Sequence, residues 1–218
     1  MKLQSIAKPS AAEFLPAHRD LPSLRKAAAG CRGCPLYLHG TQTVFGAGNP
    51  RARLMMVGEQ PGDREDLEGK PFVGPAGLLL DDCLQEAGID RDDVYITNAV
   101  KHFKWEPRGK RRIHKKPSAR EIAACRPWFD AESQAVKPAL IVCLGATAAQ
   151  ALLGRSFRVT QNRGNALAVP DMPPILATVH PSSILRAPDD ESRKEARALF
   201  IRDLRAAAAF LRTQRRAA

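Results

Sequence analysis

The segment from Lys104 to Lys116, KWEPRGKRRIHKK, is densely positive and contains one titratable imidazole. Seven lysines and arginines and one glutamate surround a single histidine, His114, in a chain whose net charge is +11. Charge at this density is typical of phosphate binding, and an imidazole at its centre predicts chemistry on the bound backbone. The same composition also suits a solvated loop or a nuclear-localisation-like run.

Three further polar side chains each follow a short apolar run. Glu59 lies in GEQPG, Asn98 ends VYITN, and His180 begins HPSS. In a parallel sheet, ligands bind outside the carboxyl ends of the strands, so we expect these three side chains to converge on one edge. Taken singly, they are also consistent with a turn carboxylate, a strand-end cap and a structural histidine.

The five cysteines divide into two kinds. Cys83 falls among leucines at helical spacing and Cys143 lies inside an apolar run, so both are expected to fill the core. Cys31 and Cys34 form a C-x2-C pair, and Cys125 follows the basic segment. Three thiols are one ligand short of a common four-ligand metal site.

Four apolar runs of strand length alternate with helical patterns, which predicts a parallel sheet covered on both faces. We therefore expect an α/β fold, a three-layer α/β/α sandwich around a central four-stranded parallel sheet. The expected strands are residues 54–57, 94–100, 140–144 and 175–179, and the main helices are residues 77–88, 117–134, 146–154 and 191–214. Residues 163–170 are expected to form a small hairpin or turn.

Length and composition limit the class of protein. A chain of 218 residues with 44% hydrophobic residues suits one domain over residues 1–218, with residues 1–15 and 214–218 loose. No apolar run approaches a membrane span, and the amino terminus lacks a signal peptide's apolar region. We expect a soluble, cytoplasmic monomer, in which cysteines favour a metal, a reactive thiol or core packing over disulfides.

Four motifs together resemble the uracil-DNA glycosylase superfamily. They are GEQPG, GKPFVGPAG at residues 69–77, TNAVKH at 97–102, and HPSS at 180–183. The resemblance runs from about Cys31 to the last helix and is closest to the iron-sulfur family 4 enzymes, within them to the UdgX group. Gln60 replaces the usual alanine of GEAPG, His102 stands where a cluster cysteine is expected, and GKRRIH at 109–114 is an insertion. All three departures are UdgX-like.

The resemblance and the side-chain chemistry together assign the candidate site. A glycosylase flips its base out of the stack and reads it in a pocket. Phe72 can stack on the base, and the Asn98 amide matches uracil O4 and N3–H. By resemblance, Glu65 crowds the uracil C5 position. The expected catalytic residues are Glu59, His114 and His180; the uracil-binding residues are Gln60, Asp63, Phe72, Asn98 and His180; the DNA-binding residues are Lys110, Arg111, Arg112, Ser182, Ser183 and Arg186.

The resemblance also completes a metal site, because His102 matches a cluster-ligand position. The implied set is Cys31, Cys34, His102 and Cys125, and the implied cofactor is a [4Fe-4S] cluster. The same four ligands are an ordinary structural zinc set, so zinc is the alternative. A cluster held by these residues would pin residues 101–125, the basic loop and the helix after it.

The resulting hypothesis is a protein that binds uracil-containing DNA, preferably single-stranded, and excises uracil. UdgX-like proteins are thought to replace the attacking water with the loop histidine, here His114, which links the protein to the abasic site. The first alternative is a turnover family 4 enzyme in which water attacks. The second is a noncatalytic iron-sulfur module that recognises uracil or abasic sites in DNA.

Overall fold

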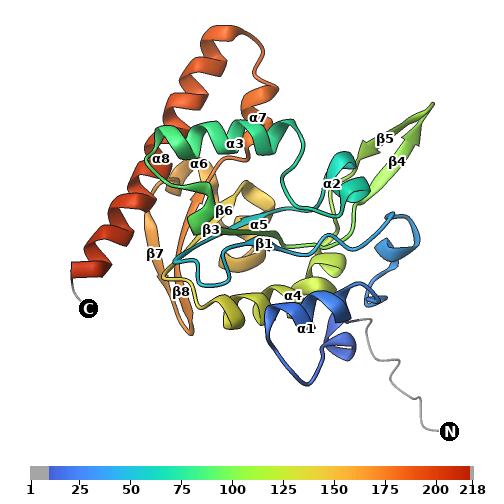
Figure 1. Ribbon diagram of the computed structural model, residues 1–218. Coiled ribbons are helices and arrows are strands. Elements are labelled where there is room, and N and C mark those ends of the chain that lie inside the picture. Colours follow the sequence, from blue (N-terminus) through green and yellow to red (C-terminus); the bar gives the residue numbers. More distant parts are fainter. Residues whose placement is uncertain (1–9, 217–218) are drawn as a thin grey trace, which may run out of the picture.

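The computed structural model describes residues 10–216, which fold around a six-stranded sheet (Figure 1). The strand order is β1-β3-β2-β6-β8-β7. The four central strands are parallel, as predicted, and two antiparallel edge strands, β1 and β7, extend the expected sheet. The strands are β1 Ala47–Gly48, β2 Leu54–Gly58, β3 Val94–Asn98, β6 Leu140–Leu144, β7 Ala166–Val169 and β8 Met172–Thr178.

Apolar residues on both faces explain why the central strands read as continuous hydrophobic runs. Every residue of β2, β3 and β6 is buried. Side chains alternate across a strand, so Leu54 and Met56 pack into one layer while Met55 and Val57 pack into the other. The sheet is therefore the middle layer of a sandwich, as the sequence predicted.

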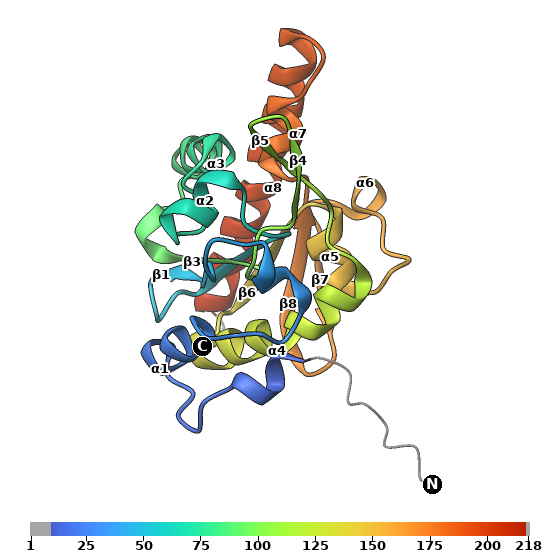
Figure 2. The ribbon, with the colours of Figure 1, turned by 90° about the vertical axis from the view of Figure 1, so that its right-hand side faces the viewer.

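Helices cover the two faces separately, as Figures 1 and 2 show. One face carries α3 Pro75–Glu86, α7 Pro181–Leu185 and α8 Asp190–Arg216. The other carries α4 Ala119–Val136, α5 Ala146–Leu153 and α6 Val159–Asn162. Outside α4 lie η1 Ala11–Phe14 and α1 Leu21–Ala28. The short elements η2 Pro35–Leu38, α2 Asp63–Glu68 and η3 Arg91–Asp93 occupy connections.

The predicted helices begin and end within two residues of the observed ones, because their termini carry clear signals. Ser118 and Glu121 form a capping box at the start of α4, for example. None of the helices in residues 10–216 combines the length and apolarity that crossing a membrane requires.

The expectation of loose termini is wrong for the residues that the structure describes. Ala11 is 1% exposed within η1, which packs against α4, and α8 continues to Arg216. The rest of the predicted loose ends, residues 1–9 and 217–218, lies outside the described residues. Residues 163–170 supply the first strand of a hairpin that is longer than predicted, because β7 pairs with β8 through a turn in which Asp171 has a φ of 58°.

The basic segment, expected as a loop, is a two-stranded hairpin that projects from the body of the protein (Figure 1). Its strands are β4 Trp105–Arg108 and β5 Arg111–His114. Arg108 pairs with Arg111, so the turn has two residues, and Gly109 adopts a φ of 60°. Two-residue hairpin turns favour such a left-handed residue, which explains why this polar segment forms strands.

Candidate active site

Glu59, Asn98 and His180 all lie at the carboxyl edge of the sheet, as predicted. Glu59 follows β2, Asn98 ends β3, and His180 lies two residues beyond β8. The main chain ties the first two connections together, because the Val100 amide donates to the Glu59 carbonyl oxygen at 3.0 Å. A carboxylate, an amide and an imidazole therefore share one edge.

Asn98 and Phe72 both lie close against Gly58. A Cβ atom at Gly58 would lie 2.3 Å from Asn98 Oδ1 and 2.7 Å from Phe72 Cζ, so a larger residue would displace the amide and the ring. Phe72 has a φ of 57°, a conformation that costs a bulky residue about 1–3 kcal/mol. Strain of this kind persists where the direction of a side chain matters. The Phe72 ring lies 5.8 Å from the His180 ring, centroid to centroid.

The carboxamide of Asn98 has an unused acceptor. Asn98 is 2% exposed, and its Oδ1 atom is buried with no hydrogen-bond partner among the described residues. Leaving a buried acceptor unpaired costs about 1–3 kcal/mol. The position therefore suits a ligand that brings an N–H group into the space beside Phe72.

His180 is prepared to act as a neutral hydrogen-bond donor. Its Nδ1 accepts from the Ser182 amide at 3.1 Å and lies 2.8 Å from the Ser182 hydroxyl. Burial lowers the pKa of His180 to about 4, although the charge of Glu59 opposes this. The ring is thus neutral near pH 7, and with Nδ1 accepting, the proton resides on Nε2.

His114, at the end of β5, contacts Glu59 at the carboxyl edge of the sheet. Its Nε2 lies 3.2 Å from Glu59 Oε1, and the Glu59 side chain is 20% exposed. Burial alone would raise the pKa of Glu59. Hydrogen bonds from His114 and Thr147, with the charges of His114 and Lys116, nevertheless hold that pKa below its usual value. Glu59 is therefore an anion in contact with the imidazole.

Gln60 holds the base of the hairpin. Its Nε2 donates to the Lys104 carbonyl oxygen at 3.0 Å and to the Lys115 carbonyl oxygen at 3.3 Å. Lys104 also donates its amide to Gln60 Oε1 at 3.3 Å. Gln60, expected to bind uracil, thus bonds the residues that flank the hairpin on the side away from its turn.

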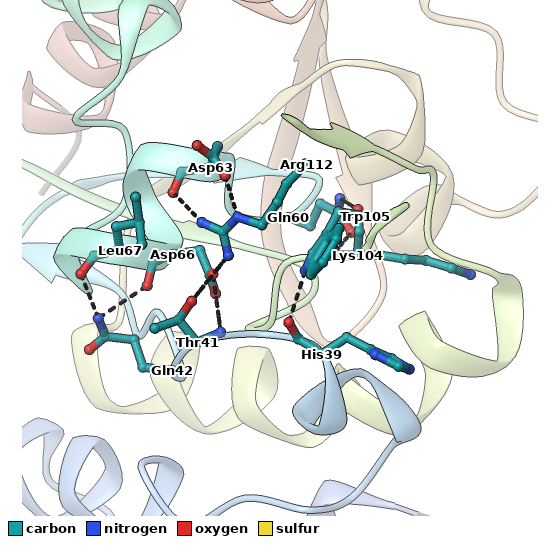
Figure 3. Close-up of polar contacts among 10 residues, drawn as sticks. All are labelled: His39, Thr41, Gln42, Gln60, Asp63, Asp66, Leu67, Lys104, Trp105 and Arg112. Carbon is teal, nitrogen blue, oxygen red and sulfur yellow. Dashed lines mark hydrogen bonds and ion pairs between the residues drawn. The ribbon is translucent and has the colours of Figure 1, made fainter. Parts of the chain in front are cut away.

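Arg112, expected to contact DNA, bonds instead within the protein (Figure 3). Its guanidinium lies 2.6 Å from Asp63 Oδ1 and 2.6 Å from Asp66 Oδ2. The group also lies 5.5 Å from the Phe103 ring centroid and 5.6 Å from that of Trp105. Asp63, expected near uracil, is likewise used in this contact. Phosphate would have to displace a buried carboxylate, since Asp66 is 0% exposed.

Glu65 supports the Phe72 loop. Its Oε1 accepts from the Gly74 amide at 2.9 Å, three residues before Gly77. A Cβ at Gly77 would lie 1.8 Å from the Phe72 carbonyl oxygen. The Glu65 carboxylate, expected to crowd the uracil C5 position, therefore bonds the loop that carries the stacking ring.

The remaining predicted DNA contacts lie on two exposed parts of the surface. Lys110 and Arg111 are exposed at the hairpin tip, and Arg186 is exposed after α7. Ser182 and Ser183 mainly support His180. The Ser183 hydroxyl donates to the His180 carbonyl oxygen at 2.7 Å. Lys110 and Arg111 at the hairpin tip, together with Arg186, therefore remain the candidates for binding DNA phosphates.

The three predicted metal-binding cysteines are buried in one cluster of residues around α4. The Trp128 ring nitrogen donates to Cys31 Sγ at 3.2 Å, and the Lys101 amide donates to Cys125 Sγ at 3.3 Å. Hydrogen bonds to sulfur stabilise thiolates, the form in which cysteine binds metals. Burial raises the pKa of Cys34 and raises that of Cys125 to about 12, so a bound metal would have to displace these protons.

His102, the fourth expected ligand, is 5% exposed, and its Nε2 lies 3.0 Å from Thr43 Oγ1. Burial lowers its pKa to about 4, against the charge of Asp66, so the ring is in the neutral form that ligates metals. By donor type and burial the four residues suit an iron-sulfur cluster. Across residues 10–216, no three histidine, cysteine, aspartate or glutamate side chains converge closely enough to hold a single metal ion.

Two supporting residues were missed from the sequence. Thr147, in the first turn of α5, bonds Glu59, and it could have been found because it follows the carboxyl end of β6. Asp66 anchors Arg112 and accepts from the Thr41 amide at 2.9 Å. No local signal identifies Asp66, since its partners lie far away in the sequence.

Comparison with known proteins gives the same family as the motifs. Residues 45–205 match the family model described as the uracil DNA glycosylase superfamily. A type-4 uracil-DNA glycosylase of Thermotoga maritima is 38% identical over 84% of this chain and 91% of its own length. Another, of Sulfurisphaera tokodaii, is 34% identical over 84% of this chain and 86% of its own length. With Glu59, Asn98 and His180 on one edge of an α/β/α sandwich, this chain belongs to the uracil-DNA glycosylase superfamily.

Proposed function

We propose that this protein excises uracil from DNA and then captures the abasic sugar on His114. The observation that carries the excision is the buried, unpartnered Oδ1 of Asn98 beside the Phe72 ring. Such an acceptor requires a donor from a ligand, and uracil presents its N3–H between two carbonyl groups. The names of the type-4 relatives support the same substrate.

Recognition of the base follows from the polarity of the Asn98 amide. Its Oδ1 accepts from uracil N3–H while its NH2 group donates to O4. Cytosine has an acceptor at N3 and a donor at N4, so it meets this amide with the opposite polarity. Phe72 provides the stacking face, and its strained backbone aims the ring.

Cleavage of the N-glycosidic bond leaves the electron pair on uracil N1 and positive charge at C1′ of the sugar. His180 donates its Nε2–H to uracil O2, where the negative charge gathers. A neutral donor suits this role, because its proton is held in place without adding charge before the bond breaks. The Glu59 carboxylate stabilises the sugar cation from the same edge.

Capture by His114 is supported by its 3.2 Å contact with Glu59. The lone pair of one imidazole nitrogen forms a bond to C1′, and the proton on the other nitrogen passes to Glu59. The products are an alkylated neutral imidazole, a protonated Glu59 and the uracil anion, so charge and protons balance. The new bond is an N-glycosidic bond to a neutral imidazole, which is a poor leaving group. Each protein molecule therefore reacts once, as expected for the UdgX group.

Two alternatives differ in their products. A turnover glycosylase would release both free uracil and an abasic site, with a water activated by Glu59 in place of His114. A noncatalytic binding module would release neither. The Glu59–His114 contact favours the capture reaction over the first, and the prepared tautomer of His180 favours an enzyme over the second.

The DNA strand is proposed to pass between the hairpin tip and α7. Lys110 and Arg111 at the tip and Arg186 after α7 supply exposed positive charge for phosphates, which gives affinity without sequence preference. An unpaired strand spares the energy of opening a base pair, so single-stranded DNA is the preferred partner. We propose that the protein acts as a monomer.

A [4Fe-4S] cluster held by Cys31, Cys34, His102 and Cys125 is the proposed cofactor, with zinc as the alternative. Its contribution is structural, since it crosslinks the amino-terminal segment, the turn after β3 and α4. The N–H groups directed at Cys31 and Cys125 support this assignment. No step of the proposed reaction depends on the cluster.

A uracil-containing oligonucleotide, single-stranded and labelled at its 5′ end, tests the proposal. After incubation, a denaturing gel separates a protein–DNA adduct from free DNA, and chromatography measures released uracil. We expect equal amounts of adduct and free uracil. Free uracil with an alkali-labile site but no adduct would establish the turnover enzyme, and neither product would establish the binding module.

A further inference from the structure

A buried lysine bonds the main chain of the proposed uracil-reading residue, Asn98. Lys101 is 0% exposed, and its ammonium group forms an ion pair with Glu132 of α4, which is also 0% exposed. Its other two hydrogen bonds are with the end of β3, at 2.6 Å to Thr97 Oγ1 and 2.9 Å to the Asn98 carbonyl oxygen. An ammonium has three N–H donors, and each of these has one acceptor.

The carboxylate is satisfied just as fully. Glu132 accepts from the Gly46 amide at 2.9 Å, from the Tyr95 hydroxyl at 2.9 Å and from Thr97 Oγ1 at 2.9 Å, besides Lys101. Removing two charges from water is unfavourable, and a buried ion pair is often no more stabilising than apolar residues of similar volume. Stability alone therefore does not account for this pair.

The turn that Lys101 holds touches both parts of the proposed reaction. Asn98, whose carbonyl oxygen accepts from the ammonium, carries the uracil-reading amide. Two residues on, the Val100 amide donates to the Glu59 carbonyl oxygen at 3.0 Å. The Lys101 amide itself donates to Cys125 Sγ on α4, the same helix as Glu132.

From these contacts we infer that Lys101 is a positioning residue for uracil recognition and bond cleavage. Its ammonium closes the 98–101 turn and fastens it to α4, which sets the Asn98 amide opposite Phe72 and the main chain of Glu59 beside it. The inference rests on the proposed function, because it assumes that Asn98 reads uracil. It assigns Lys101 no contact with DNA.

The test replaces both charges together, since removing one would leave the other buried and unpaired. In Lys101→Met with Glu132→Gln, the amide keeps acceptors for Gly46 and Tyr95 but nothing holds the Asn98 carbonyl. Lys101→Met alone is the second variant, in case the double variant does not fold, because the Asn98 carbonyl oxygen then loses its donor. Glu132 keeps its hydrogen bonds from Gly46, Tyr95 and Thr97. Tyr95→Phe is the matched control, because it removes one hydrogen bond from the same carboxylate without a contact to Asn98.

Single-turnover uracil release is measured against protein concentration for each variant, alongside thermal unfolding. We expect the limiting rate of the double variant to fall by about tenfold to a hundredfold, a loss typical of a misplaced reacting group. The half-saturating concentration should stay unchanged, because the proposed phosphate contacts come from other elements, the hairpin tip and the residue after α7. Tyr95→Phe should lower the unfolding temperature and keep the wild-type limiting rate.

A wild-type limiting rate in a folded double variant, or in folded Lys101→Met if the double variant does not fold, would overturn the inference. An equal loss of rate in Tyr95→Phe would also overturn it, since the network would then act only through stability. Asn98→Ala separates the role of Lys101 from the proposed function. If that variant still releases uracil at the wild-type rate, the proposed function fails, whereas a slow Asn98→Ala beside a fast double variant refutes only the role of Lys101.

Discussion

Arg112 and His114 lie two residues apart on β5, so their side chains point to the same face of the hairpin. Phe103 lies under both, with its ring centroid 5.5 Å from the Arg112 guanidinium carbon and 6.2 Å from the His114 ring centroid. The pairing of Arg112 with Asp63 and Asp66 therefore fixes the same strand face that brings His114 to Glu59.

Arg112→Ala should consequently act on the adduct and not on the electrostatics of DNA binding. Loss of its bond to buried Asp66 should destabilise the fold by about 1–3 kcal/mol and lower the adduct yield. Lys110→Ala with Arg111→Ala should instead reduce the slope of log affinity against log salt by about 0.7 for each phosphate of single-stranded DNA that is no longer neutralised. Binding titrations at several salt concentrations compare the two. A reduced slope in Arg112→Ala would place that side chain on phosphate after all.

His114→Ser should abolish the covalent adduct while uracil release continues. Glu59, Asn98 and His180 still recognise the base and stabilise charge separation, and water then completes the reaction. The expected product is an alkali-labile abasic site with free uracil, seen on a denaturing gel. An adduct that survives in this variant would assign the nucleophile to another residue, which peptide mapping would locate.

Asn98→Ala should lose uracil processing, because two hydrogen bonds disappear and the unpaired base edges add roughly 1–3 kcal/mol each. Phe72→Ala should weaken it by about 1–3 kcal/mol through the loss of stacking. Uracil release under single-turnover conditions measures both. Leu78→Ala is a suitable control, since Leu78 is 59% exposed on α3. Unchanged rates in both pocket variants would move the pocket elsewhere.

Uracil release by the wild-type protein should be nearly independent of pH from about 8 down to about 5. The pKa of His180 is lowered to about 4, so its ring stays neutral over this range, and the lowered pKa of Glu59 keeps that carboxylate charged. Single-turnover rates of uracil release, measured across this range, check the prediction. A marked fall in rate between about pH 8 and about pH 5 would contradict the neutral state of His180.

Purified protein should be brown and contain iron and acid-labile sulfide. Cys125→Ala should lose both and reduce the soluble yield, because a missing ligand removes a crosslink. Cys83→Ala is the matched control, since Cys83 is a similarly buried cysteine on α3, outside the proposed ligand set. Colourless, folded wild-type protein with stoichiometric zinc would replace the cluster with the zinc alternative.

The sequence predicted the layers of the fold well because burial on both faces leaves a direct signature. The runs around Leu54 and Leu140 are uniformly apolar for that reason. The expectation that ligands bind at the carboxyl ends of parallel strands placed Glu59, Asn98 and His180 together, without knowledge of their distances. The hairpin was harder, since β4 and β5 carry charge on both faces and only Gly109 signals the turn.

The partners of charged residues could not be predicted in the same way. Arg112 reads as one more cation of a basic segment, yet its carboxylates come from α2, 46 and 49 residues away. Lys101 likewise reads as surface charge and is 0% exposed. In both cases the environment depends on tertiary packing, which no local pattern records.

Gln60 bonds the main chain at the base of both hairpin strands. In the proposed reaction, the sheet edge selects the base that leaves, and the hairpin supplies the group that takes its place at the sugar. Gln60 and Arg112 hold the base and one face of the hairpin, so residues elsewhere on it can be substituted without disturbing the sheet. Replacing the residue at position 114 with other nucleophiles is therefore a route to new DNA-attachment chemistries on an unchanged uracil-reading scaffold.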